Sequence, residues 1–240
     1  LLSSEAFSLP DELDLPAFIR EYLEVRKIRL FSHQQSCLEA IRQQKSVIIT
    51  TSTASGKTLG YMIPILERAM QHPEETTLLL FPLKALANDQ WKQIKEMQEL
   101  MKINVPAFIY DGDTPLSQRS MIRSKARIIL TNPYELHYIL PWHAKWARFY
   151  SHLGVVVIDE AHTYRGVFGS NFSLLVRRLK RVCHFYQSKP VFVLSSATMQ
   201  NAQEFSKKLI DESCQLIDQD GSSKGTKHFV FYNPFKNGQD

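Results

Sequence analysis

The chain has 240 residues, of which 44% are hydrophobic and 22% charged, a composition typical of a globular protein with ample core. No apolar run reaches the roughly 18 residues of a membrane span, and the start lacks a signal-peptide pattern. We therefore expect an intracellular protein without a membrane partner, cytoplasmic if bacterial and nuclear if eukaryotic. Three separated cysteines without C-x-x-C spacing argue against a disulfide framework or a zinc site. The net charge of +5 weakly favours an anionic partner such as nucleic acid.

Hydrophobic periodicity predicts helices that alternate with short apolar strands. In chain order we predict a helix over residues 13–30, a helix over 32–41 with Ser32 as N-cap, a strand over 47–49, a helix over 59–70, a strand over 76–81, a long helix ending near residue 101, a strand over 106–110, a short helix ending near 121, a strand over 127–131, a helix containing 135–140, a strand over 153–158, a helix over 172–186, a strand over 190–194, a helix over 201–209 and a strand over 214–217. This alternation implies βαβ units, and hence an α/β fold with a mostly parallel sheet and helices on both faces.

The strand over residues 47–49 runs into a loop of small residues that ends in Gly56-Lys57-Thr58, and a helical pattern follows. This order is typical of a P-loop, where backbone N–H groups and the helix dipole surround a phosphate. We predict that Lys57 reaches the β- and γ-phosphates of a nucleotide and that the Thr58 hydroxyl ligates Mg²⁺. The predicted nucleotide-binding residues of the loop are Thr53, Ala54, Ser55, Gly56, Lys57 and Thr58. Thr51 and Ala54 replace glycines of the general pattern, and the alternative is a polar turn with a chance lysine.

An acidic pair, Asp159-Glu160, ends the apolar strand over residues 153–158. Downstream of a P-loop, two such carboxylates supply what phosphoryl transfer needs. One holds Mg²⁺, and the other orients the attacking water and accepts its proton. We assign Asp159 to the metal and Glu160 to the water, and we count both with Lys57 as catalytic residues. The alternative is a pair of solvated acids at a strand end.

Five unusual stretches each follow directly on a predicted strand. They are the P-loop, Pro82-Leu83-Lys84, Thr131-Asn132-Pro133, Asp159-Glu160-Ala161-His162 and Ser196-Ala197-Thr198. Ligands of parallel sheets bind beyond the carboxyl ends of the strands, so we expect all five stretches along one edge of the sheet.

In order and spacing these stretches resemble motifs I, Ia, Ib, II and III of superfamily 2 helicases, over about residues 31–198. The resemblance implies a RecA-like lobe of the P-loop NTPase class that uses ATP and Mg²⁺. It also implies that Gln34, within a stretch similar to the Q-motif, reads the adenine. By the same resemblance, contacts to the sugar-phosphate backbone of one strand come from Pro82, Lys84, Thr131, Asn132 and Pro133, and coupling between the ATP and nucleic-acid sites comes from His162, Ser196 and Thr198. Alternatively, the last three only bond neighbouring strand ends.

Residues 50–57 and 159–170 are similar to the Hrq/YprA-type DNA helicases, a branch related to the RecQ-four-like proteins. Residues 225–234 are similar to the linker that follows the first lobe in that branch. This resemblance implies an ATP-dependent helicase that moves 3′ to 5′ on single-stranded or forked DNA and serves DNA repair. Ala54 is then a feature of the branch.

The same resemblance implies three parts: a helical extension over residues 1–30, the RecA-like lobe over 31–218, and a linker over 219–240 toward a second RecA-like lobe. Too few residues follow Thr198 to form that second lobe, which brings arginine fingers in these helicases. An arginine finger contributes on the order of 10³–10⁵ in rate. We therefore expect this chain alone to bind nucleotide weakly and to hydrolyse it very slowly.

Three other functions fit parts of the sequence. An RNA-directed DEAH-type ATPase shares the nucleotide motifs, because neither set reads the 2′-hydroxyl. A degenerate binding module is disfavoured because Lys57, Thr58, Asp159 and Glu160 are intact. A small-molecule kinase would not need the stretches that resemble motifs Ia, Ib and III.

Aromatic and basic residues outside the motifs are expected to be structural. The helical spacing of Trp142, His143 and Trp146 favours packing against the domain over stacking on bases. The basic run over residues 177–181 favours a solvated helix face.

Overall fold

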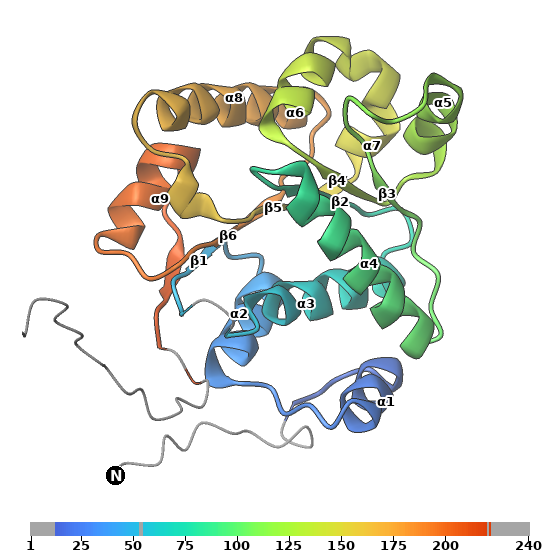
Figure 1. The fold of residues 1–240 in the computed structure, drawn as a ribbon, viewed down its shortest axis with the longest axis vertical. Coiled ribbons are helices and arrows are strands. Elements are labelled where there is room, and N and C mark those ends of the chain that lie inside the picture. Colours follow the sequence, from blue (N-terminus) through green and yellow to red (C-terminus); the bar gives the residue numbers. More distant parts are fainter. Residues whose placement is uncertain (1–12, 53–54, 220, 222–240) are drawn as a thin grey trace, which may run out of the picture.

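The computed structural model describes residues 13–52, 55–219 and 221 (Figure 1). Thr53 and Ala54 of the predicted nucleotide loop lie outside the described residues, as do residues 1–12 and nearly all of the predicted linker. In the part of the chain that the structure describes, no helix has the length and apolar character needed to cross a membrane.

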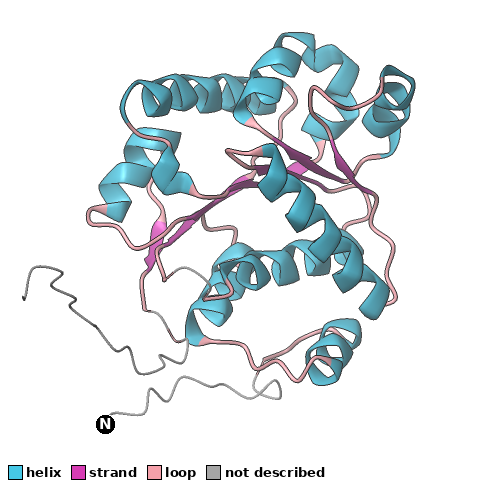
Figure 2. Cartoon of the chain, viewed as in Figure 1, coloured by secondary structure: helices cyan, strands magenta, loops and turns pink. Residues whose placement is uncertain are grey.

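The described residues contain one seven-stranded sheet in which every neighbouring pair of strands is parallel (Figure 2). Its strands are β1 (Val47–Ile49), β2 (Thr76–Leu80), β3 (Ala107–Ile109), β4 (Ile128–Thr131), β5 (Leu153–Ile158), β6 (Val191–Ser195) and β7 (Gln215–Ile217). Their order across the sheet is β3-β4-β2-β5-β6-β1-β7. The predicted parallel α/β sheet is confirmed.

Helices connect these strands. They are α1 (Ala17–Val25), α2 (Ser32–Arg42), α3 (Lys57–Gln71), α4 (Lys84–Leu100), α5 (Leu116–Lys125), α6 (Pro133–Ile139), the 3₁₀ helix η2 (Leu140–Trp146), α7 (Ala147–Ser151), the 3₁₀ turn η3 (Ala161–Thr163), α8 (Gly166–Phe185) and α9 (Ala202–Ile210). Helices lie on both sides of the sheet in Figure 2, as the alternating sequence pattern predicts.

Two hydrophobic cores flank the sheet because successive strand residues point to opposite faces. Val155 and Val157 of β5 pack in the core formed with α1, α2, α3 and α4. Val156 and Ile158 pack in the opposite core, with α5 to α9. The α1 residues Ile19 and Leu23 are fully buried in the first of these cores.

Three helix boundaries differ from the predictions. The N-cap of α2 is Phe31 and not Ser32. The Gln34 Oε1 accepts the Phe31 N–H at 2.9 Å, so the capping interaction falls one residue before the predicted position. Helix α1 is shorter than predicted and starts after Pro16. Helix α8 begins at Gly166, six residues before the predicted start, and α7 was not predicted.

The five stretches that follow the strands lie along the carboxyl edge of the sheet. Hydrogen bonds continue the sheet one residue beyond β5 and β6, from Asp159 N to Leu80 O and from Ser196 N to Ile49 O, both at 2.9 Å. These bonds hold the start of the acidic stretch beside the end of β2, and the Ser196 stretch beside the end of β1. The shared edge that the sequence predicts is therefore present.

Candidate functional site

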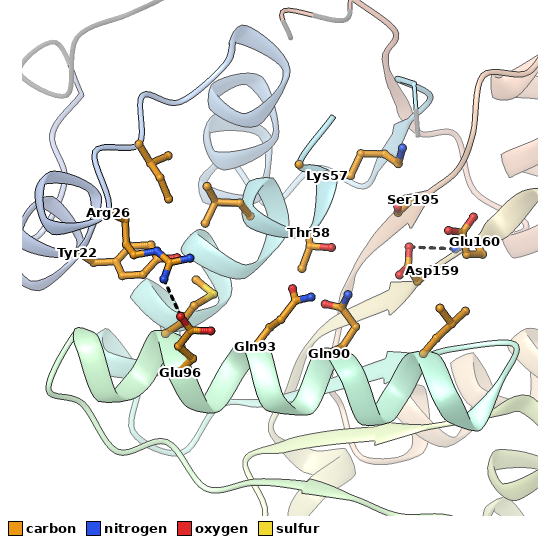
Figure 3. A pocket seen from close by; sticks show the side chains of 15 residues that line it. Tyr22, Arg26, Lys57, Thr58, Gln90, Gln93, Glu96, Asp159, Glu160 and Ser195 are labelled. Atoms are coloured by element: carbon orange, nitrogen blue, oxygen red, sulfur yellow. Dashed lines mark hydrogen bonds and ion pairs between the residues drawn. The ribbon is translucent and has the colours of Figure 1, made fainter. Parts of the chain in front are cut away.

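A cavity of about 620 Å³ opens at this edge, within the size range of small-molecule sites (Figure 3). One end brings together four predicted residues, Lys57, Thr58, Asp159 and Glu160, with Ser195 of β6. From there the cavity follows α4 toward α1. This second part is lined by Leu86, Gln90, Gln93, Glu96 and Met97 of α4, by Tyr22 of α1 and by Arg26, the C-cap of α1.

Residues of α2 contact and support the described part of the P-loop. Gly56 is the N-cap of α3 in the left-handed region, with φ 76°, which favours glycine. A Cβ there would lie 2.7 Å from the Gln34 Nε2, so the Gln34 amide would have to move. Ser55 is buried, and its carbonyl lies 3.0 Å from the His33 Nε2. Two helix residues therefore fix the loop at the start of α3.

Lys57 lies in the first turn of α3, where the positive end of the helix dipole adds to its charge. Its Nζ donates to the carbonyls of Thr51 at 3.0 Å and Ser52 at 2.7 Å. The ammonium is thus folded over its own loop and faces the cavity, the position from which it can exchange these carbonyls for phosphate oxygens.

Asp159 is a largely buried carboxylate that suits a cation. Burial raises the pKa of Asp159 above its usual value, while hydrogen bonds from Ser195 and from the Glu160 N–H, the latter at 3.0 Å, and the charge of Lys57 act in the opposite direction. A carboxylate and the Thr58 hydroxyl are the hard oxygen donors that Mg²⁺ prefers. The residues therefore fit the predicted ion. No group of three or more acidic, histidine or cysteine residues that could hold a metal by itself occurs in the described residues.

Glu160 has a strained backbone, with φ 48° in the left-handed region. Such conformations cluster at functional sites, where the surrounding structure enforces them. Asp159 and Glu160 are both labelled at the right of Figure 3, facing the end of the cavity that Lys57 and Thr58 line. Glu160 therefore lines the same cavity as Lys57 and Thr58.

His162 connects the acidic pair to the Ser196 stretch. Its Nδ1 lies 3.2 Å from the Glu160 Oε2 and 3.4 Å from the Ala197 N. One ring nitrogen cannot serve both partners at once, since it must carry a proton to bond Glu160 and must lack one to accept from Ala197. Ser196 is fully buried and Thr198 is exposed. The predicted coupling role of these residues has a physical path and stays a prediction.

Gln34 lies beneath the P-loop. Its Nε2 donates to the Gly56 carbonyl at 2.9 Å, its Oε1 accepts from Phe31, and only 3% of the residue is exposed. Both ends of the amide are occupied, and Gln34 is not among the residues that line the cavity. In this conformation Gln34 supports the loop, and its contact with adenine stays a prediction.

The predicted nucleic-acid contacts lie at the same edge, but several of their side chains bond within the chain. Lys84 forms an exposed ion pair with Asp113 at 2.7 Å. The Thr131 hydroxyl donates to the Tyr110 carbonyl at 2.6 Å, and Asn132 caps α6 by accepting from the Glu135 N–H. Pro133 is buried at the start of α6, and Pro82 is half-buried. Exposed ion pairs are worth about 0–1 kcal/mol, so Lys84 can exchange its partner for a phosphate.

Several cavity residues were missed by the sequence analysis. Leu86, Gln90, Gln93 and Met97 recur at helical spacing along one face of α4, and all four line the cavity. The Gln90 Oε1 is buried and bonds no other described residue. The helical spacing could have predicted that these four residues share one face of α4. Glutamines on an amphipathic helix, however, are typical of a face exposed to solvent.

A P-loop on β1 and an acid pair on β5, separated only by β6, define the class of protein as a P-loop NTPase with a RecA-like fold. Within that class, the DEAD/DEAH box helicase family matches residues 31–205, which is well over half of the chain. The chain therefore belongs to the DEAD/DEAH box helicase family.

The relatives support the Hrq/YprA-like branch. The chain is 44% identical to the uncharacterized ATP-dependent helicase YprA of Bacillus subtilis, over 94% of this chain and 30% of that protein. It is 43% identical to the ATP-dependent helicase HRQ1 of Saccharomyces cerevisiae, over 85% of this chain and 20% of that protein. A crystal structure of the DUF1998 helicase MrfA bound to DNA has a TM-score of 0.92 and 42% identity, and covers 97% of this chain and 33% of MrfA. The chain thus spans a third or less of these relatives.

Proposed function

We propose that this chain is the ATP-binding motor lobe of an ATP-dependent DNA helicase that moves 3′ to 5′ and separates strands in DNA repair. The observation that carries the proposal is the meeting of Lys57, Thr58, Asp159 and Glu160 in one cavity at the edge of the sheet. The similarity to YprA and HRQ1, both named as ATP-dependent helicases, supports the same activity here. Intracellular action, cytoplasmic in a bacterium or nuclear in a eukaryote, is part of the proposal.

The chemistry follows from the positions of the side chains. Lys57 neutralises the β- and γ-phosphates, and Thr58 with Asp159 holds Mg²⁺, which supplies positive charge against the phosphates. Glu160 orients the attacking water and accepts its proton. The second RecA-like lobe of the complete protein closes the open side of the cavity.

Coupling to the nucleic acid runs along the sheet edge. His162 contacts both Glu160 and Ala197, so a change at the γ-phosphate reaches the stretch that contains Ser196 and Thr198. Pro82, Lys84, Thr131, Asn132 and Pro133 contact the backbone of one strand, and such contacts position a strand without reading its sequence.

DNA is the favoured nucleic acid, as a single strand or a fork. The crystal structures of MrfA, at 42% and 44% identity, are described as bound to DNA, and one also holds AMPPNP. The DEAD-box helicase Mss116 was solved with single-stranded RNA, but at 19% identity that likeness concerns the fold alone.

The test is ATP hydrolysis by the complete protein with single-stranded DNA or single-stranded RNA of matched sequence, at equal salt because phosphate contacts are salt-dependent. We expect stimulation by DNA only. The Glu160→Gln variant is the control, and it should retain ATP binding and lose turnover. Stimulation by RNA alone would reassign the protein to the RNA-directed ATPases, and turnover by Glu160→Gln would remove Glu160 from its role.

A further inference from the structure

A stripe of exposed aromatic rings leads away from the sheet edge along α6 and η2. Tyr134, Tyr138 and Trp142, which we call the aromatic stripe, are 73%, 65% and 58% exposed. They are spaced four residues apart along α6 and η2. The packing expected for Trp142 is therefore wrong, whereas Trp146 is buried as expected. The backbone is kinked at Trp142, with φ −98° and ψ 25°.

The first ring of the stripe is fixed by a ladder of stacked rings that reaches the core. Tyr134 lies over Phe168 with ring centroids 6.2 Å apart and planes at 25°. Phe168 lies 5.4 Å from Tyr164, and Tyr164 stacks on Phe172 at 3.9 Å. Tyr164 and Phe172 are fully buried. The Tyr134 ring is therefore held in one orientation, with the face opposite Phe168 open. A planar group such as a base can stack on that open face at low entropic cost.

The charge beside the aromatic stripe is positive. The Arg178 Nη1 lies 2.9 Å from the His137 Nδ1 of α6. Arg178 and Arg181 of α8 also line a shallow cavity of about 230 Å³ with His143 and Phe185. The Lys145 Nζ lies 5.0 Å from the centre of the Trp142 ring.

Acidic side chains are rare in both described segments. Helix α8 contains no aspartate or glutamate. The α6–η2 segment contains only Glu135, which is buried and lies 3.4 Å from the Arg119 guanidinium. Asp211 and Glu212 form ion pairs with Arg177 and Lys180 of α8, whereas Arg178 and Arg181 form none with the described residues. The surface thus combines flat exposed rings with two arginines that lack an acidic partner among those residues, which is chemistry that holds a single-stranded nucleic acid.

We propose that the aromatic stripe, with Arg178 and Arg181, binds a single-stranded segment of nucleic acid beyond the motif contacts. The strand leaves the sheet edge at Asn132 and Pro133, bases stack on Tyr134, Tyr138 and Trp142, and phosphates lie toward the arginines of α8. The inference rests on the proposed function, since it extends the path of the same strand. Protein interfaces are also rich in tyrosine, tryptophan and arginine, so a protein partner is one outcome of the test.

The experiment separates stacking from charge by using two strands of equal length. The complete protein is titrated with a fluorescent oligothymidylate or with the same backbone without bases, and binding is followed by anisotropy. Stacking on one ring is typically worth fivefold or more in affinity, roughly 1–3 kcal/mol. We therefore expect the triple variant Tyr134→Ala, Tyr138→Ala, Trp142→Ala to bind oligothymidylate on the order of 100-fold more weakly, and the base-free strand nearly as well as wild type.

Two controls address folding and contact. Leu116→Ala changes a side chain that is 86% exposed on α5 and is not part of the stripe, and it should leave both affinities unchanged. Tyr134→Phe with Tyr138→Phe keeps the rings and should restore most of the affinity. Oligothymidylate should also quench a component of tryptophan fluorescence that Trp142→Phe removes, since this variant keeps a ring but loses the indole.

Each outcome has one meaning. If wild type binds neither strand, both the proposed function and this inference fail. If wild type binds and the triple variant matches it on both strands, the inference fails while the proposed function stands. If the triple variant instead loses a concentration-dependent self-association seen by light scattering, with strand affinity unchanged, the stripe is a protein contact and the inference is overturned.

Discussion

Lys57 is the side chain on which the nucleotide site depends most directly. Its ammonium is held by two carbonyls of its own loop and faces the cavity. Removing it takes away charge-assisted hydrogen bonds to phosphate, each worth about 1.5–3 kcal/mol. We predict that Lys57→Ala weakens Mg-nucleotide binding by about 10- to 100-fold in calorimetry. Lys45→Ala removes an exposed lysine just before β1 and should bind as wild type does. Equal affinity of Lys57→Ala and wild type would refute the P-loop assignment.

Asp159 gives the site a dependence on pH. Burial raises the pKa of Asp159 above its usual value, so the protonated form persists to a higher pH than in an ordinary aspartate. Only the ionised form can hold Mg²⁺. We predict that Mg-nucleotide affinity falls as the pH is lowered through this raised pKa, and that Asp159→Asn removes the dependence. Asp113→Asn, which changes an exposed acid outside the cavity, should keep it.

The same shift has a consequence for stability without ligand. A raised pKa in the folded chain means that the ionised carboxylate is destabilising there, and this cost disappears as the pH falls through the folded pKa. Asp159→Asn should therefore raise the melting temperature at alkaline pH, and its advantage should shrink toward acidic pH. A melting difference that does not change with pH would show that Asp159 titrates normally.

At the scale of elements, α8 is positioned by one glycine. A Cβ on Gly169 would lie 2.4 Å from the Tyr164 carbonyl oxygen, so the helix approaches the end of the acidic stretch too closely for any side chain. We predict that Gly169→Ala destabilises the chain by about 1–3 kcal/mol through overpacking, which lowers the melting temperature by about 2–10 °C. Ser170→Ala, at the next and exposed position, is the matched control. A Gly169→Ala chain that melts with this control would contradict the close packing.

An element could be predicted from the sequence where its own residues indicate its burial and its ends. Strand β5 was predicted to its exact bounds, because six apolar residues end in an acid pair and both faces of the strand are buried. The start of α8 was missed because residues 166–171 contain two glycines and Arg165 offers no side-chain cap. The periodicity of residues 142–146 could not show that η2 kinks at Trp142, which places one tryptophan outside and another in the core.

The same reasoning applies to the site. Asp159 and Glu160 follow β5 directly, and Lys57 and Thr58 follow the loop that leaves β1. Parallel pairing brings the ends of these strands to one edge. Gln90 and Gln93 lie within a helix, so their place in the cavity depends on how α4 packs against the sheet, which the sequence of α4 does not show. Gln34 depends on the close approach of α2 to Gly56 and could not be placed by motif spacing.

At the scale of the whole molecule, the cavity lacks a free arginine among the described residues. Arg26 is the arginine in its lining, and it is bound to Glu96 at 2.7 Å, at the end of the cavity away from Asp159 (Figure 3). No guanidinium among these residues therefore faces a bound γ-phosphate. Charge that develops there during hydrolysis would be met by Lys57 and Mg²⁺ alone.

We therefore predict that the 240-residue chain hydrolyses ATP on the order of 10³–10⁵ times more slowly than the complete protein with DNA, the factor that an arginine finger contributes. The comparison needs single-turnover hydrolysis at saturating ATP, so that weak binding is not mistaken for slow chemistry. A Glu160→Gln form of the chain sets the background from contaminating ATPases. Turnover by the chain within about tenfold of the complete protein, well above that background, would mean that this lobe carries the whole catalytic apparatus and that the second lobe acts in movement and not in chemistry.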